Sequence, residues 1–324
     1  MIPRDAREEH VHLKNVINTD KLRVDTAKQA KSEVDSLSWS ADGDRFVSCS
    51  RDGGVRIFKA DKLTEERMIP GSWTFAEPHP VDNNLLAMVS WDGKMRLADL
   101  RTAAAAGECD LRRLNDAVDK VLGFSWNLTG TALSLHTRAD FVQVVNIVAS
   151  EMSLAGEGMT CATEVNGTCW DASDRVWTAL GGTPGKLLVS GNDPTSELIA
   201  HQYGTLSIAR SRDGAVIASG GQDSLAVLWD TKNTVAVRSF PGATAPVSCM
   251  AFSSDGGIIA WGCGGAGKDG DSALYLAGAR TGVQYAALTT NAPVSRVAWH
   301  PKEARVAYSL AGDSGSLQVL NFTS

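Results

Sequence analysis

The sequence predicts an all-β fold, a single domain built as a seven-bladed β-propeller. One pattern of short alternating strands and polar turns recurs seven times along the 324 residues, at a step of about 43 residues. The chain also contains 31 Gly but only 10 Pro, which suits many tight turns between strands. Four short strands with their turns need about 40–45 residues. Each repeat is therefore expected to form one four-stranded blade.

The first strand of every repeat is the most regular part of the pattern. The seven copies begin at Val34, Trp73, Val121, Val165, Leu206, Val247 and Val294. Equivalent positions in this strand are assigned to Trp39, Phe75, Trp126, Trp170, Arg210, Phe252 and Trp299. Apolar and polar residues alternate within the copies, so each sheet presents apolar side chains to its neighbours. Such sheets are not stable alone, and a closed ring buries every face.

An aspartate occupies the turn that is expected to join the third and fourth strands of most repeats. These turn residues are Asp52, Asp92, Asp140 and Asp223, with Asp271 in the sixth copy. A carboxylate in such a turn accepts hydrogen bonds from main-chain amides that would otherwise be unpaired. We interpret these aspartates as structural.

Residues 1–33 precede the first repeat, and residues 34–324 form the predicted propeller. The stretch HVHLKNVIN at residues 10–18 has the character of a strand. We expect the N-terminal segment to contribute an outer strand that pairs with the last blade and closes the ring, because closure removes two unpaired sheet edges.

Charge and composition argue against several classes of function. The formal net charge is −6, and the basic residues are interspersed with acidic ones, which disfavours direct binding of nucleic acid over the whole surface. No apolar stretch approaches the length of about 20 residues that spans a membrane. The charged N-terminus does not suit a signal peptide, and the six cysteines form no C-x-x-C pair. We expect reduced thiols in an intracellular protein.

Two glycine-rich segments resemble catalytic loops but lack essential parts. Residues 262–268 (GCGGAGK) have the spacing of a phosphate-binding loop, yet Asp269 stands where a magnesium-binding hydroxyl is needed. Residues 312–315 (GDSG) resemble the nucleophile loop of a serine protease, but Ser316 breaks the pattern and no base segment accompanies it. The histidines, including His10 and His12, show no defensible cluster of metal ligands. We therefore expect no enzyme activity, metal, cofactor or small-molecule substrate.

Side chains beside the turn aspartates are the candidates for binding a partner. The residue before each Asp is expected to point into one face of the disc, and Arg138 lies beside the third turn. Arginine and aromatic side chains dominate the energy of protein interfaces. We predict a protein-binding face that contains Arg51, Trp91, Arg138 and Gln222. Packing of Trp91 against a neighbouring blade, and solvated arginines, are the alternatives.

The repeats resemble those of WD40 proteins. Trp229-Asp230 is the one intact Trp-Asp dipeptide, Ala98-Asp99 takes its place in the second copy, and Ala200-His201 is the nearest relative of the usual Gly-His start. The order and spacing of several further segments are similar to those of THO complex subunit 3 proteins. These segments are VDSLSWS at 34–40, MRLADLRT at 95–102, DSLAVLWD at 223–230, VAVRSF at 235–240, FSSDG at 252–256 and VAWHP at 297–301.

This resemblance implies a non-catalytic scaffold for protein–protein interaction within a THO-like (TREX) complex of the nucleus. Such a subunit would act in mRNA processing and export, would bind the other protein subunits, and would associate with RNA mostly indirectly. Ala98-Asp99 and the loops at 262–272 and 312–316 depart from the family pattern. Because partner contacts lie in loops, individual contacts do not transfer.

A second hypothesis is a peptide-reading WD40 propeller that recognises a histone tail or a degron in its central pocket. An enzymatic function would rest only on the two imperfect glycine-rich loops.

Overall fold

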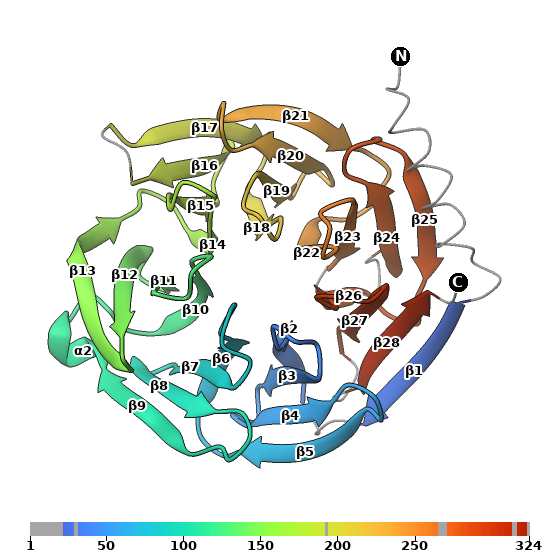
Figure 1. Ribbon diagram of the computed structural model, residues 1–324. Coiled ribbons are helices and arrows are strands. Elements are labelled where there is room, and N and C mark those ends of the chain that lie inside the picture. Colours follow the sequence, from blue (N-terminus) through green and yellow to red (C-terminus); the bar gives the residue numbers. More distant parts are fainter. Residues whose placement is uncertain (1–21, 29–31, 192–193, 265–270, 313–315, 323–324) are drawn as a thin grey trace.

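The computed structural model describes residues 22–28, 32–191, 194–264, 271–312 and 316–322. These residues form seven four-stranded antiparallel sheets, arranged as blades around a central channel (Figure 1). The predicted seven-bladed propeller is confirmed. The described part also contains one short helix, α2 (Leu111–Leu114), and none of its helices is long and apolar enough to cross a membrane.

Each of the first four blades runs from the channel outward in chain order. Blade 1 consists of β2 (Val34–Trp39), β3 (Arg45–Ser50), β4 (Val55–Lys59) and β5 (Thr64–Ile69). Blade 2 consists of β6 (Trp73–Pro78), β7 (Leu85–Ser90), β8 (Lys94–Asp99) and β9 (Ala105–Asp110). Blade 3 consists of β10 (Val121–Trp126), β11 (Ala132–Thr137), β12 (Phe141–Val148) and β13 (Glu151–Thr160). Blade 4 consists of β14 (Val165–Trp170), β15 (Val176–Leu180), β16 (Gly185–Ser190) and β17 (Ser196–His201).

The remaining blades complete the ring. Blade 5 consists of β18 (Thr205–Arg210), β19 (Val216–Gly221), β20 (Ala226–Asp230) and β21 (Val235–Phe240). Blade 6 consists of β22 (Val247–Phe252), β23 (Ile258–Cys263), β24 (Ala273–Gly278) and β25 (Gln284–Thr289). Blade 7 consists of β26 (Val294–Trp299), β27 (Arg305–Leu310), β28 (Ser316–Phe322) and, as its outer strand, β1 (Leu22–Lys28).

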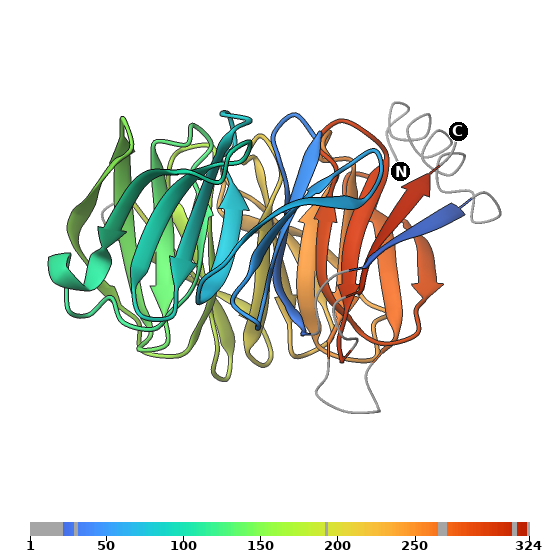
Figure 2. The ribbon, with the colours of Figure 1, turned by 90° about the horizontal axis from the view of Figure 1, so that it is seen from below.

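The ring is closed by pairing between the two ends of the chain. Strand β1 runs antiparallel to β28, with Leu22 opposite Phe322 and Lys28 opposite Ser316 (Figures 1 and 2). The Ala27 side chain of β1 is buried in an apolar cluster with Leu317 and Val319 of β28. Residues 10–18, where the sequence suggested a strand, lie outside the described residues.

Two details of the sequence assignment are wrong. Phe75 was equated with Trp39, but β6 ends at Pro78, so Phe75 lies three residues too early and corresponds to Ser36. Both Ser36 and Phe75 directly follow the bulge of their strand. The aspartate-bearing turns also join the second and third strands rather than the third and fourth, because the first strand of each repeat is the innermost strand of a blade and the outer strand comes last.

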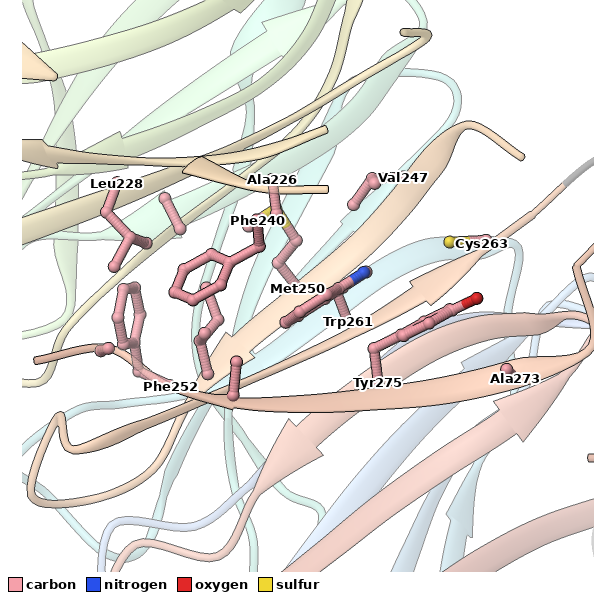
Figure 3. Close-up of a cluster of buried hydrophobic side chains, with 14 of the residues drawn as sticks. Ala226, Leu228, Phe240, Val247, Met250, Phe252, Trp261, Cys263, Ala273 and Tyr275 are labelled. Carbon is pink, nitrogen blue, oxygen red and sulfur yellow. The ribbon is translucent and has the colours of Figure 1, made fainter. Parts of the chain in front are cut away.

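The core lies between the blades. The larger apolar clusters each combine side chains of neighbouring blades. Figure 3 shows one of them, in which Trp261 of blade 6 stacks on Tyr275, with ring centroids 5.3 Å apart, and packs against Phe240 of blade 5. Trp261 is fully buried. Every blade is thus held by its neighbours, and the loops at the two ends of the channel project from a stiff frame.

Candidate protein-binding face

The turns between the second and third strands of the blades emerge on one side of the disc, which we call the turn face. Arg51, Trp91, Arg138 and Gln222 are all exposed in these turns. The main-chain N–H groups of Arg51, Arg138 and Gln222 donate at 3.1, 3.0 and 2.9 Å to carbonyl oxygens in the loops that precede the first strands. The side chains therefore stand on turns whose backbone is fixed.

Trp91 and Arg138, from neighbouring blades, form a pair on this face. The guanidinium carbon of Arg138 lies 5.9 Å from the centre of the Trp91 ring, within cation–π range. Trp91 remains 39% exposed, which is unusual for so large an apolar side chain. The pair offers an aromatic surface beside a positive charge, the combination that anchors many interfaces.

Arg51 and Gln222 are placed differently. Arg51 bridges Glu33 and Asp35 at 2.8 and 3.4 Å, and its side chain is 65% exposed. It lines the same cavity as Trp91. Gln222 does not line that cavity, and its turn belongs to blade 5. The structure therefore groups Arg51, Trp91 and Arg138 and leaves Gln222 apart.

A cavity of about 980 Å³ opens at the turn-face end of the channel. One side is apolar, with Phe75, Leu122 and Phe124 from blades 2 and 3. The other side, formed by blades 7 and 1, is charged and includes Asp35 and Arg296. Such a volume is typical of a ligand pocket, and its two sides differ in chemistry.

Burial controls the charges in this cavity. Burial raises the pKa of Asp35, while the nearby guanidinium groups of Arg51 and Arg296 oppose the shift. Burial also lowers the pKa of His136 to about 4, so this histidine is neutral at physiological pH. His136 lines the cavity, and its Nδ1 atom has no hydrogen-bond partner among the described residues.

The turn aspartates accept hydrogen bonds from different donors. Asp52 accepts a hydrogen bond from the Arg56 guanidinium at 2.6 Å and another from the Gly54 amide at 3.1 Å. Both bonds lower the pKa of Asp52. Asp92 accepts from the Ser90 hydroxyl, which likewise lowers the pKa of Asp92. In the third and sixth blades the acceptors Asp140 and Asp271 bind the main-chain amides of Val165 at 3.2 Å and Thr244 at 2.9 Å.

Asp223 belongs to a buried chain of hydrogen bonds in blades 4 and 5. Its Oδ1 atom lies 3.0 Å from Nδ1 of His201, and Nε2 of His201 lies 2.9 Å from Oγ of Ser219. The same Oγ accepts from the indole N–H of Trp229 at 2.9 Å. Burial lowers the pKa of His201, although Asp223 opposes that shift. His201 is thus a neutral structural link.

The other described histidines of the inner strand ends, His79 and His300, have structural partners in the next blade. His79 and His300 each lie edge-on to a tryptophan of the next blade and bond a glycine carbonyl there, at 3.0 and 3.1 Å. No group of three or more potential metal ligands occurs among the residues described. Residues 265–270, 313–315, His10 and His12 lie outside them. The six cysteines are free, and five of them are buried.

Sequence reasoning missed Asp35, Leu122, His136 and Arg296, which line the cavity. Asp35 and Leu122 are the second residues of their first strands, a position that is partly exposed in most blades. Comparing that position across the seven copies would have identified a lining of the channel. No sequence signal marked His136.

Comparisons with known proteins agree with this architecture. The family model "WD domain, G-beta repeat" (WD40) matches residues 22–59, 192–230 and 234–271. The chain is a seven-bladed β-propeller that carries WD40 repeats in these segments. The β-propeller domain of Cps50 (Swd1) from Myceliophteria thermophila superposes on 93% of this chain and on all of its own chain, with a TM-score of 0.75 at 15% identity. That likeness concerns the fold alone.

Relatives of known name differ in how much of the propeller they cover. THO complex subunit 3 of Arabidopsis thaliana is 25% identical over 292 residues, which are 87% of each chain. WD repeat-containing protein AAC3 of Dictyostelium discoideum is 21% identical over 69% of this chain and 52% of its own. Protein FIZZY-RELATED 2 of Arabidopsis thaliana is 26% identical over 59% of this chain and 38% of its own. WD40 propellers act typically as non-catalytic modules for protein–protein interaction.

Proposed function

We propose that this WD40 propeller is a scaffold subunit of a THO-like nuclear complex that acts in mRNA processing and export. The observation that carries the proposal is the similarity to THO complex subunit 3, which spans 87% of both chains. The FIZZY-RELATED match covers only 38% of that relative. A relative of matching extent is a better guide to the role of a whole chain than a shared repeat.

The turn face is the proposed docking surface. Trp91 and Arg138 form an exposed aromatic and cationic pair, and Arg51 lies at the rim of the same cavity. Interface energy concentrates in a few Trp, Tyr and Arg side chains, each costing about 2 kcal/mol or more on truncation. We therefore assign the main contacts with other protein subunits to this group, while contact with RNA is indirect.

Affinity purification of the tagged full chain, followed by mass spectrometry, tests the proposal. We expect other THO subunits among the specific partners. The double variant W91A/R51A should lose them in a stringent salt wash and still melt like wild type, because both side chains are exposed. The control R67A/V237A alters an arginine and an exposed valine on outer strands and should keep the partners. Undiminished yield with W91A/R51A would show that the turn face is the wrong surface.

A second candidate function is the reading of a short peptide, and the cavity at the turn face favours it. Its charged and apolar sides suit an extended segment with a basic and an apolar side chain. Histones or ubiquitin-ligase components among the purified partners, without THO subunits, would support this candidate against the first.

A further inference from the structure

The end of the channel opposite the turn face, which we call the lower channel, departs from the repeat at one position. The first strand ends in a tryptophan in blades 1, 3, 4 and 7, and in Pro78 and Phe252 in blades 2 and 6. The indole N–H groups of Trp39, Trp126 and Trp170 each donate to a carbonyl of the preceding blade, at 3.1, 3.3 and 3.0 Å. These bonds tie neighbouring first strands together. In blade 5 the same position is Arg210.

The guanidinium group of Arg210 has few protein partners. Within the described structure it donates from Nη1 to the main-chain oxygen of Arg212, at 3.3 Å. No described carboxylate lies within 4.0 Å of it. A guanidinium offers five N–H donors. Most of the donors of Arg210 are therefore free to bind another group.

Arg210 lines a cavity of about 410 Å³ whose walls are both polar and apolar. The hydroxyl groups of Ser38, Ser125 and Ser254 line it, and none of them bonds to another described residue. The charged residues of its lining are Arg210, Arg212 and Glu77. Arg212 donates to the main-chain oxygen of Pro301 at 2.7 Å and so spans from blade 5 to blade 7.

Glu77, on β6, lies across the channel from β18, which carries Arg210 (Figure 1). Burial raises the pKa of Glu77 to about 7, and the positive charge of Arg210 opposes the shift. The strands on either side of β6 contribute serine and apolar side chains to the cavity, and His300 is neutral because burial lowers its pKa. The cavity therefore holds a guanidinium with free donors, free hydroxyls and a carboxyl group that is readily protonated.

We propose that the lower channel binds an oxyanion group, a carboxylate or a phosphate, with Arg210 as its charge partner and the serine hydroxyls as further donors. A planar guanidinium matches the oxygen geometry of both groups. The size of the cavity admits a small molecule or the acidic end of a partner chain. The proposal does not depend on the function assigned to the turn face.

Two substitutions of Arg210 test the site. R210W introduces the tryptophan found in blades 1, 3, 4 and 7 and removes the positive charge, and R210Q keeps a shorter polar side chain without the charge. The probes are inorganic phosphate and citrate, titrated into the full chain by calorimetry at constant ionic strength against chloride. Loss of one charge-assisted contact should weaken the binding of the probes at least about tenfold in both variants. R67Q, which removes a rim arginine that also bonds a main-chain oxygen, serves as the control.

The outcomes distinguish the source of the oxyanion. Binding of phosphate alone assigns a phosphoryl group, binding of citrate alone assigns a carboxylate, and binding of both supports the general site. E77Q should bind more tightly than wild type at pH 8 and nearly equally at pH 5.5, because only the ionised Glu77 repels an anion. Absence of saturable binding at millimolar concentrations, or unchanged affinity in R210W and R210Q, would overturn the proposal.

Discussion

Replacing Asp223 by alanine should destabilise the propeller far more than the same change at Asp92, although both residues occupy the same turn position. Asp223 faces His201, whose side chain is completely buried, whereas the side chain of Asp92 is 51% exposed. In D223A the Nδ1–H group of His201 loses its acceptor in a place that water does not reach. A buried unpaired donor costs about 1–3 kcal/mol.

The remaining bonds of Asp223 add to this cost. Its carboxylate also accepts from the amides of Gln202 at 2.9 Å and Leu225 at 3.3 Å. Each such bond contributes about 0.5–1.5 kcal/mol, reduced here because Gln202 is exposed. We expect about 2–4 kcal/mol for D223A. For D92A we expect about 1 kcal/mol or less, since the Ser90 hydroxyl still donates to the carbonyl of Lys94.

Thermal melting of both variants beside wild type measures the difference. At about 2–4 °C per kcal/mol, D223A should lower the melting temperature by roughly 4–16 °C, and D92A by a few degrees at most. D223N, which keeps an acceptor oxygen, should fall between D223A and wild type. Equal shifts for D223A and D92A would refute the reasoning, because the buried histidine would then contribute nothing.

Three further predictions concern other parts of the ring. The folded pKa of His136, about 4, lies below its ordinary 6.5, so the unfolded chain takes up the proton first and stability is lost as the pH falls from 6.5 to 4. The stability of wild type relative to H136L should therefore drop by about 3 kcal/mol over this range, measured by urea unfolding at both ends; a constant difference would contradict it. A27D should destabilise the closing strand by several kcal/mol, because an unpaired carboxylate would enter the cluster with Leu317 and Val319; V24D, on an exposed side chain, is the control, and equal melting temperatures would exclude this role for β1. W91A and R210W lie at opposite ends of the channel, so the combined variant should lose partner binding as W91A does and anion binding as R210W does. A larger or smaller loss of either in the combined variant would mean that the two ends are coupled.

The sequence predicted the positions of the strands better than the arrangement of the surface residues. The first strands begin at the expected residue in all blades but the fifth, where the strand starts at Thr205 instead of Leu206. These starts were visible because period-two alternation repeats in every copy. The register of blade 2 was missed because Phe75 directly follows a bulge and the strand then ends at Pro78, which carries no aromatic signal.

The closing strand and the paired site residues gave weaker signals. Strand β1 reads LRVDTAK, and of its described side chains only Ala27 is buried, so its apolar periodicity is slight. Trp91 and Arg138 were chosen separately, for their positions before the turn aspartates. Their contact joins two blades across 47 residues of sequence and follows from the ring geometry alone. The same holds for the neutral His136.

Positions where the blades depart from one another carry the strongest argument about function. The third residue of the first strand is small in five blades: Ser36, Gly123, Gly167, Ser207 and Cys249. It is large in the other two, Phe75 and Arg296, and both line the cavity at the turn face. Arg296 here donates to the main-chain oxygen of Asp35 in blade 1, but five blades close without a large side chain at this position, so the fold does not require one. The same argument applies to Arg210 at the lower channel. In three other blades a tryptophan at this position bonds the preceding blade, whereas Arg210 makes no such bond within the described structure. Side chains that the ring does not need, placed at the two ends of its channel, are the ones for which binding is the better explanation.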